Sequence, residues 1–241
     1  MNDQVTEEFQ KLKQGLRTGF TALYQGFDRQ LVQIESYLSL LSFLQPRFPF
    51  PALEISAIAP DLALSFASRI LDMRPSVILE LGSGVSTLIA GYALQRNKHG
   101  KVISIEHHEE WGNGTANSIR QHGLNDCVEL VRVPLVDVTI QDQHHQWYDT
   151  SFLKNIAPRS INLFLVDGPP GTLQKLARYP ALPIVHDYLA DDAVVIVDDG
   201  DREDEKEMVG RWLREFPGFQ ATYWGSAKGT WILTRSNTNH H

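Results

Sequence analysis

Cysteine is almost absent from this 241-residue chain, which contains only Cys127. A single cysteine excludes an intramolecular disulfide and any metal site built from several thiolates. Long uncharged apolar runs are also missing, and none approaches the roughly 18 residues that a membrane-spanning helix needs. The first residues are polar and mixed in charge, unlike a signal peptide. These absences favour a cytoplasmic protein without a membrane span.

Positive charge is in deficit, with 22 Lys and Arg against 29 Asp and Glu and a formal net charge of −7. This balance argues against a general affinity for nucleic acid or for anionic membranes. The hydrophobic content of 42% and the charged content of 21% are ordinary for a globular protein. The length suits one α/β domain with an extension.

A strand, a glycine turn and a helix are predicted in direct succession from Val77 onward. Aliphatic residues fill both faces of Val77–Leu81, which is typical of a buried parallel strand. Gly82-Ser83-Gly84 then ends the strand, and Ser86 or Thr87 is available to cap the helix that follows. This geometry brings backbone N–H groups and a helix N-terminus against a ligand. Thr87 occupies the third glycine position of the dinucleotide fingerprint, which disfavours a pyrophosphate ligand.

Glu106 directly follows the next predicted strand, Val102–Ile105. A carboxylate at this position has two acceptor oxygens and can bind both hydroxyl groups of a ribose. Enzymes that bind NAD and enzymes that bind S-adenosylmethionine (SAM) share this feature. Glu106 therefore indicates an adenosine-containing ligand without choosing between them.

Three aspartates end two later strands: Asp167 follows Ile161–Val166, while Asp198 and Asp199 follow Ala193–Val197. Adjacent parallel strands end at the same edge of a sheet, so we expect these side chains to converge. Like charges at one point repel unless they are solvated, protonated or paired with a cation. Oxygen ligands suit Mg²⁺, Mn²⁺ or Ca²⁺. Two interpretations stay open: a metal site, or helix caps and a pocket wall without metal.

The end of the chain predicts a β-hairpin, with strands at Phe219–Trp224 and Thr230–Arg235 joined by a short glycine-containing connection. Residues 138–152 are predicted to form a surface loop or part of a substrate wall. The segment that leads to Leu189 is predicted to be partly helical, with Arg178 and Tyr179 exposed near the ligand edge.

The sequence Glu80-Leu81-Gly82-Ser83-Gly84 resembles motif I of the class I SAM-dependent methyltransferases. The resemblance covers about residues 76–235 and implies a Rossmann-like, seven-stranded, mostly parallel α/β sheet closed by an antiparallel hairpin strand. Pro134 stands where the family often has an acid, so backbone groups or Asp137 are expected to contact the adenine. The resemblance implies SAM as the cofactor, with contacts from Glu80, Gly82, Ser83, Gly84, Ser86, Glu106, His107, Pro134, Leu135 and Asp167.

The acids at the strand ends are similar to those of cation-dependent O-methyltransferases that act on small molecules or sugars. This resemblance implies that Asp167, Asp198 and Asp199 hold Mg²⁺ or Mn²⁺, with Asp167 and Asp199 as catalytic residues. Pro169 occupies the position of the base proposed for sugar-type relatives, which leaves Asp199, His186 or metal-bound hydroxide as candidates. The implied reaction is methyl transfer to a hydroxyl of a small molecule or glycan. An NAD(P)-linked oxidoreductase and a non-catalytic SAM-binding scaffold are the alternatives.

Residues 1–59 are predicted to form a helical extension and a proline-rich linker ahead of a SAM-binding domain at 60–235, which begins with a helix at 60–73. Gly26 weakens the helix by about 1 kcal/mol relative to Ala, so the extension is either one continuous helix or a helical pair with a break near Gly26. The seam of this helix either packs on its own domain or forms a homodimer surface. Residues 236–241 form a tail that ends in two histidines, as purification tags do. The apolar seam comprises Phe9, Leu12, Leu16, Phe20, Leu23, Phe27, Leu31, Ile34, Leu38 and Leu41.

Overall fold

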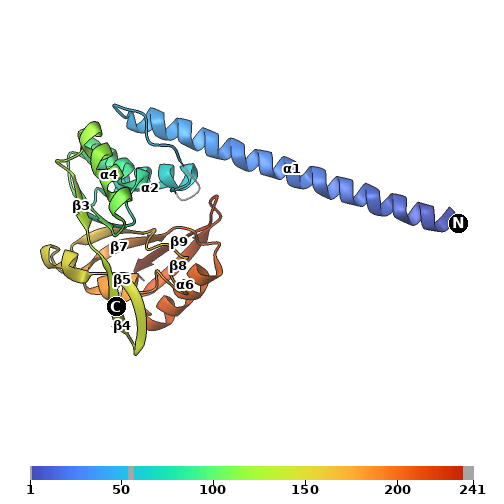
Figure 1. Cartoon of the computed structure of the whole chain (residues 1–241). Coiled ribbons are helices and arrows are strands. Elements are labelled where there is room, and N and C mark those ends of the chain that lie inside the picture. Colours follow the sequence, from blue (N-terminus) through green and yellow to red (C-terminus); the bar gives the residue numbers. More distant parts are fainter. Residues whose placement is uncertain (1, 54–56, 236–241) are drawn as a thin grey trace, which may run out of the picture.

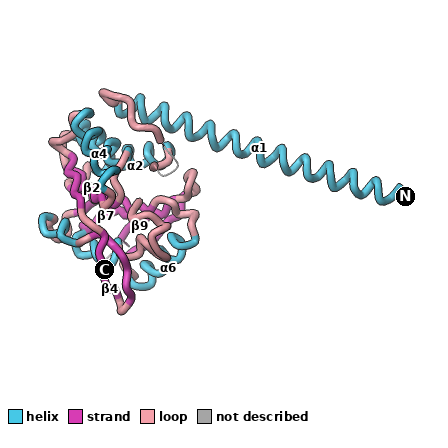
Figure 2. The backbone as a smooth tube through the Cα atoms, viewed as in Figure 1, coloured by secondary structure: helices cyan, strands magenta, loops and turns pink. Residues whose placement is uncertain are grey.

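A computed structural model describes residues 2–53 and 57–235 and shows a central sheet flanked by helices, from which one long helix projects (Figures 1 and 2). The predicted tail 236–241 lies outside the described residues. The helices are α1 (Asn2–Leu44), α2 (Pro60–Met73), α3 (Val85–Asn97), α4 (Glu109–His122), α5 (Ala181–Val185) and α6 (Glu203–Glu215), with short 3-10 helices η1 (Thr150–Asn155) and η2 (His186–Tyr188). The strands are β1 (Val77–Leu81), β2 (Lys101–Glu106), β3 (Val128–Arg132), β4 (Leu135–Ile140), β5 (Gln143–Tyr148), β6 (Ile161–Val166), β7 (Leu189–Val197), β8 (Phe219–Trp224) and β9 (Thr230–Arg235).

The main sheet has seven strands in the order β3-β2-β1-β6-β7-β9-β8. Strands β3, β2, β1, β6 and β7 run parallel to their neighbours, whereas β9 is antiparallel to both β7 and β8. The predicted parallel sheet with an antiparallel terminal hairpin is therefore confirmed. The order reverses beside β1, so the carboxyl ends of β1 and β6 border a crevice where α/β sheets bind ligands.

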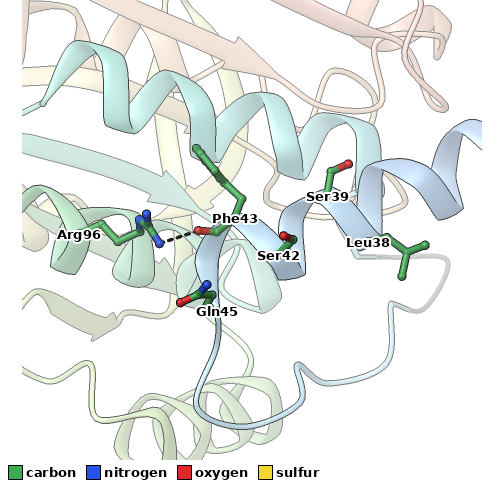
Figure 3. Close-up of a pocket in the computed structure, with 6 residues that line it drawn as sticks. All are labelled: Leu38, Ser39, Ser42, Phe43, Gln45 and Arg96. Carbon is green, nitrogen blue, oxygen red and sulfur yellow. Dashed lines mark hydrogen bonds between the residues drawn. The ribbon is translucent and has the colours of Figure 1, made fainter.

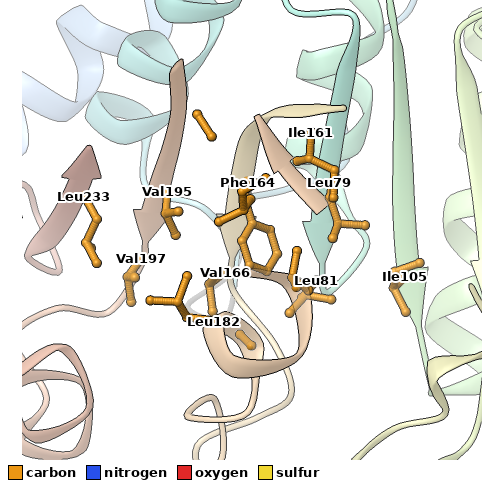
Figure 4. Close-up of a cluster of buried hydrophobic side chains, with 14 of the residues drawn as sticks. Leu79, Leu81, Ile105, Ile161, Phe164, Val166, Leu182, Val195, Val197 and Leu233 are labelled. Atoms are coloured by element: carbon orange, nitrogen blue, oxygen red, sulfur yellow. The ribbon is translucent and has the colours of Figure 1, made fainter. Parts of the chain in front are cut away.

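The two faces of the sheet build two separate cores, because successive strand residues point to opposite sides. Ile78 and Leu163 contribute to the core beneath α2 and α3. Their neighbours Leu79 and Phe164 contribute to the core on the other face, which Figure 4 shows together with Val195. The apolar runs of the central strands thus reflect burial on both faces.

Residues 138–152 were predicted as a loop, and this prediction is wrong for most of the segment. They belong largely to an antiparallel two-stranded sheet of β4 and β5. Gln141 and Asp142 form the turn with φ angles of 48° and 63°, the left-handed pair that a tight hairpin turn requires. Trp147 and Tyr148 are fully buried and fasten this hairpin to the core.

Helix α1 runs unbroken from Asn2 to Leu44, so the extension is one continuous helix and not a helical pair with a break near Gly26. Its last turns pack against the domain, where Leu40 and Leu44 are buried. Arg96 donates a hydrogen bond of 2.7 Å to the Phe43 carbonyl and holds the helix end against α3 (Figure 3). A pocket of about 590 Å³ marks this junction, lined by Leu38, Ser39, Ser42, Phe43, Gln45 and Arg96. The rest of α1 leaves the domain and projects outward (Figure 1).

No helix in the described part of the chain combines the length and the apolarity needed to cross a membrane. Helix α1 is long enough, but outside its apolar seam every turn has polar or charged residues.

Candidate active site

A cavity of about 1150 Å³ opens at the carboxyl ends of β1, β2, β6 and β7. Parallel strands end at a common edge, so residues that are far apart in the sequence meet there. The structure brings together eight of the predicted site residues in the cavity wall: Gly82, Ser83, Gly84, Ser86, Glu106, His107, Asp167 and Asp199.

The two glycines of the turn have different structural roles. Gly82 has a φ of 89°, and a Cβ there would lie 2.9 Å from the Asp167 carbonyl oxygen. Gly84 is extended, with a φ of 167°, and a Cβ there would meet nothing within 4 Å. Gly82 is therefore required by the backbone, whereas Gly84 keeps a part of the cavity free for a ligand.

Gly84 is the N-cap of α3, which corrects the expectation that Ser86 or Thr87 occupies that position. Its N–H donates to the Thr87 hydroxyl at 3.0 Å, so Thr87 caps the helix from inside the first turn. The glycine turn thus passes directly into a helix N-terminus that borders the cavity.

Glu80 was predicted to contact the cofactor, and the structure places it beneath the turn and outside the cavity wall. Its carboxylate accepts hydrogen bonds from Thr87 and, at 2.6 Å, from Ser104 of β2. Burial raises the pKa of Glu80, and the hydrogen bonds from the neighbouring hydroxyls oppose that rise. Glu80 therefore ties β1, β2 and α3 together under the ligand site.

Glu106 ends β2 and faces the cavity with both carboxylate oxygens bonded. One oxygen accepts from the backbone N–H groups of His107 and His108 at 2.8 and 2.7 Å. The other accepts from the N–H and the hydroxyl of Ser83, each at 3.0 Å. Burial alone would raise the pKa of Glu106, but the His107 side chain, whose Nδ1 lies 3.3 Å from the carboxylate, and the hydrogen bonds from His108 and Ser83 outweigh it and lower the pKa to about 2. Glu106 is thus held as an anion at the position predicted for ribose binding.

The depressed pKa of Glu106 predicts how stability depends on pH. A carboxyl group with a lowered folded-state pKa stabilises the native protein above its unfolded pKa of 4.5, and this stabilisation is lost as the pH falls towards 2. Glu106→Gln should therefore be less stable than the wild type at pH 7, and the difference should shrink between about pH 4.5 and pH 2. Urea unfolding at several pH values measures the difference. A constant difference across this range would contradict the assignment.

The predicted cofactor contacts Pro134 and Leu135, and Asp137 as the alternative adenine contact, lie elsewhere in the structure. Pro134 and Leu135 lead into the β4–β5 hairpin and are absent from the cavity wall. Asp137 is exposed on β4, opposite Gln146. These side chains were assigned by the spacing of an expected loop, whereas the chain forms an additional strand at this point.

The predicted acidic cluster exists, but an arginine lies inside it. Arg178 has a side chain that is only 4% exposed, and it binds Asp167 Oδ1 at 3.1 Å and Asp199 Oδ2 at 2.8 Å. Its guanidinium also donates to the backbone carbonyls of Pro169, Asp198 and Asp167. The sequence prediction that Arg178 and Tyr179 are exposed is therefore wrong, since both are buried.

Two more cations lie beside this acidic cluster. Arg202 lies 2.9 Å from Asp199, and Lys228 lies 3.9 Å from Asp198. Glu205 is a fourth carboxylate, paired with Arg178 and Arg202 at 3.7 Å each. Three cations thus face four carboxylates at the edge of the cavity.

The predicted metal site at Asp167, Asp198 and Asp199 does not fit this arrangement. Arg178 occupies the space between Asp167 and Asp199, and Asp198 directs one oxygen to the Asp199 N–H at 2.7 Å. Within residues 2–53 and 57–235, no three His, Cys, Asp or Glu side chains form a group suited to a metal ion. Three cations already neutralise most of the negative charge that would attract a divalent cation.

His186, one of the predicted bases, stacks on Phe216 with ring centroids 4.8 Å apart and is not part of the cavity wall. Tyr148 is a wall residue that the sequence did not reveal. Its hydroxyl is buried and has no hydrogen-bond partner among the described residues. Burial raises the pKa of Tyr148 well above its ordinary value, so the hydroxyl keeps its proton and can donate to a ligand.

A parallel sheet that ends in an antiparallel hairpin, with a glycine turn after its first strand and an acid after its second, defines the class I SAM-dependent methyltransferases. The chain belongs to the methyltransferase domain family, whose model matches residues 79–200, about half of its length. The O-methyltransferase hkm8 of Aspergillus hancockii is 27% identical over 184 residues, which are 76% of this chain and 62% of that protein. The chain thus spans less than two thirds of the length of this curated relative.

Solved structures share the fold. The methyltransferase PaMTH1 of Podospora anserina, bound to S-adenosylhomocysteine (SAH), aligns with a TM-score of 0.61 at 15% identity over 84% of this chain and 88% of that one. An O-methyltransferase of Bacillus cereus in complex with SAH aligns with a TM-score of 0.57 at 17% identity over 84% and 91%. The O-methyltransferase TomG of Streptomyces achromogenes in complex with SAM aligns with a TM-score of 0.55 at 15% identity over 85% and 89%.

Proposed function

We propose that this protein transfers the methyl group of SAM to a hydroxyl group of a small molecule or glycan. The observation that supports this most directly is the single cavity in which the Gly82–Gly84 turn, Glu106 and Asp167 all form the wall. The names of the relatives, which include O-methyltransferases bound to SAM or SAH, point the same way. An NAD(P)-linked oxidoreductase is not favoured, because the family and the antiparallel last strands are those of methyltransferases.

Two regions of the cavity suit two parts of the cofactor in this proposal, the ribose and the amino acid part. Glu106, an anion with two acceptor oxygens, binds the ribose hydroxyls and exchanges its bond from the Ser83 hydroxyl for bonds from the ligand. The backbone at Gly82–Gly84 and the first turn of α3 accommodate the amino acid part of SAM. The open space at Gly84 allows this close approach.

Asp167 is the best-placed proton acceptor for the substrate hydroxyl. Arg178 bonds to its Oδ1 and leaves Oδ2 without a hydrogen bond from the described residues. Asp199 is a poorer candidate, because Oδ2 is shared by Arg178 and Arg202 while Oδ1 lies 3.8 Å from Lys228. Asp167 therefore accepts the proton as the hydroxyl oxygen attacks the methyl carbon in line with the departing sulfur.

We further infer that Arg178 takes the position that a divalent cation holds in cation-dependent relatives. Its guanidinium neutralises Asp167 and Asp199 and orients both carboxylates at the cavity edge. The reaction then depends on positioning and deprotonation by residues of the chain itself.

Calorimetric titration of the full chain with SAM, SAH and NAD tests the cofactor. We expect SAM and SAH to bind and NAD to give no heat, because Thr87 replaces the third glycine of the dinucleotide turn. Binding of NAD without binding of SAM would refute the proposal. Transfer of a labelled methyl group from SAM to hydroxylated acceptors tests the reaction, with the O-methyl ether of each acceptor as the matched control. Equal labelling of an acceptor and its ether would exclude the hydroxyl as the target.

A further inference from the structure

Helix α1 exposes a row of large apolar side chains that nothing else within residues 2–53 and 57–235 covers. The exposed fractions range from 42% at Leu31 to 70% at Phe20 and Leu23. Single exposed apolar residues are common on protein surfaces, but continuous apolar patches of this extent mark interaction sites. The row, called the α1 stripe below, consists of Phe9, Leu12, Leu16, Phe20, Leu23, Phe27, Leu31, Ile34 and Leu38.

The α1 stripe follows an eleven-residue repeat. The spacing 3, 4, 4 occurs from Phe9 to Phe20, again from Phe20 to Leu31, and starts once more at Leu31. At about 100° per residue, all nine side chains fall within an arc of about 100°. A period of 11 residues in three turns keeps such a stripe almost parallel to the helix axis. The result is a straight apolar surface roughly 44 Å long.

The catalytic domain lies beside this surface and leaves it open. Leu40 and Leu44 are buried against the domain, and Gln33 accepts a hydrogen bond of 3.2 Å from the Asp61 N–H. These three residues lie on another side of the helix from the stripe, so Ile34 and Leu38 remain 56% and 60% exposed even where α1 is packed. Figure 1 shows the first two thirds of α1 projecting clear of the domain.

We propose that the α1 stripe of a second copy of this chain covers the first in an antiparallel two-helix pair. When two copies of the stripe are aligned antiparallel, apolar residues face apolar residues. One register places Phe9 opposite Leu38, Leu16 opposite Leu31 and Phe20 opposite Phe27. Most of the exposed apolar area would be buried in such a pair, on the order of 1,500 Å² in total, which is the size of a stable interface.

The charges beside the stripe select the antiparallel orientation. Lys13 and Arg17 lie on one edge in the N-terminal half of α1, and Asp28 and Glu35 lie on the same edge in the C-terminal half. Like edges meet in an antiparallel pair, so Lys13 faces Glu35 and Arg17 faces the region of Asp28 in the partner. A parallel pair would instead set this edge against the opposite one, which has Glu8 near its N-terminal end but beyond it only uncharged residues such as Gly15, Gly19 and Gly26, so Arg17, Asp28 and Glu35 would lack charged partners.

The polar face of α1 argues for a protein partner over a lipid surface. Helices that bind anionic membranes are rich in Lys and Arg on the polar face. Among the residues of α1 whose side chains the structure describes, the helix has no excess of positive charge, because acidic residues (Glu7, Glu8, Asp28, Glu35) are as numerous as basic ones (Lys11, Lys13, Arg17, Arg29). A second copy supplies both an apolar surface of equal length and complementary charge.

Sedimentation equilibrium of the full chain tests the pair. We expect the wild type to be a dimer and Phe20→Glu with Phe27→Glu to be a monomer. The matched control is Gln14→Glu with Gln25→Glu, which places the same two charges on the opposite face of α1 and should remain a dimer. Circular dichroism verifies that each variant keeps its folded domain. A monomeric wild type, or a stripe variant that dimerises like the control, would overturn the proposal.

Charge exchange tests the orientation. Lys13→Glu with Arg17→Glu, and separately Asp28→Lys with Glu35→Lys, should each weaken self-association at least about tenfold, because like charges then face each other. An equimolar mixture of the two variants should restore dimers, since every facing pair is again opposite in charge. Failure of the mixture to associate would exclude the antiparallel pair. Flotation of the wild type with vesicles of phosphatidylcholine and phosphatidylglycerol, together with a monomer in solution, would assign the stripe to a membrane surface instead.

Discussion

Arg178→Met should lower the free energy of unfolding by about 3–5 kcal/mol, because the substitution leaves Asp167 and Asp199 buried without their shared cation. For a chain of this size that loss corresponds to a fall in melting temperature on the order of 10 °C. Methyl transfer should fall with it, since the carboxylate of Asp167 loses the contact that orients it. Thermal unfolding and the methyl-transfer assay measure the two effects.

The matched control for this prediction is Arg202→Met. Arg202 also pairs with Asp199, but its side chain is 50% exposed, so its loss should cost about 1 kcal/mol or less. Equal losses in the two variants would show that Arg178 is not the central cation of the cluster.

The same role of Arg178 predicts that the wild type does not need a divalent cation. Activity should persist in EDTA, and Mg²⁺ or Mn²⁺ should leave the melting temperature unchanged, because the carboxylates are already paired. Activity that is lost in EDTA and restored by Mg²⁺ would return the cluster to the metal-binding interpretation.

Gly82→Ala is expected to reduce both stability and cofactor affinity. At a φ of 89°, a side chain costs about 1–3 kcal/mol in backbone strain. The new Cβ would also press on the Asp167 carbonyl at 2.9 Å and displace the end of β6, which forms the cavity floor. We expect binding of SAM to weaken at least about tenfold, because the backbone that contacts the cofactor must shift. Chemical unfolding and calorimetry with SAM measure the two effects.

Gly84→Ala is the matched control within the same turn. Gly84 has an extended backbone with open space around it, so alanine should fold without strain. Its methyl group would enter the cavity, and only the affinity for SAM should fall. A Gly82→Ala variant with wild-type stability would contradict the role that the geometry gives to that glycine.

Local patterns predicted much of this fold. The hairpin strands at Phe219–Trp224 and Thr230–Arg235 match the structure residue for residue, because a short glycine connection between two apolar strands has few alternatives. The loop prediction for residues 138–152 was wrong for a related reason. The turn of this hairpin uses Gln141 and Asp142 instead of glycine, and its buried side chains are aromatic residues within a polar segment. A tight turn without glycine leaves little signal in a single sequence.

Some features of the candidate site could likewise be predicted from local sequence, and others could not. Glu106 and the glycine turn were predicted correctly as cavity residues, since their positions follow from where two strands end. The burial of Glu80 beneath the turn could not be predicted from the motif, because a motif gives the position of a side chain along the strand but not what that side chain contacts. Arg178 was missed because arginine is ordinarily exposed. It is buried because its guanidinium donates to Asp167, Asp199 and three backbone carbonyls, which lie on segments distant from it in the chain. The one signal for Arg178 in the sequence was the group of three aspartates at the strand ends, because buried carboxylates need a cation beside them.

The sequence by itself determined the features that arise from neighbouring residues: the central strands, the glycine turn, the terminal hairpin and the continuous seam of α1. Each depends on periodicity or backbone conformation, which act over a few residues. Only the tertiary structure decided that Arg178 enters the acidic cluster and that the α1 stripe stays uncovered. Charge pairing and burial depend on segments that are distant in the chain, and their outcome is set by how those segments pack together.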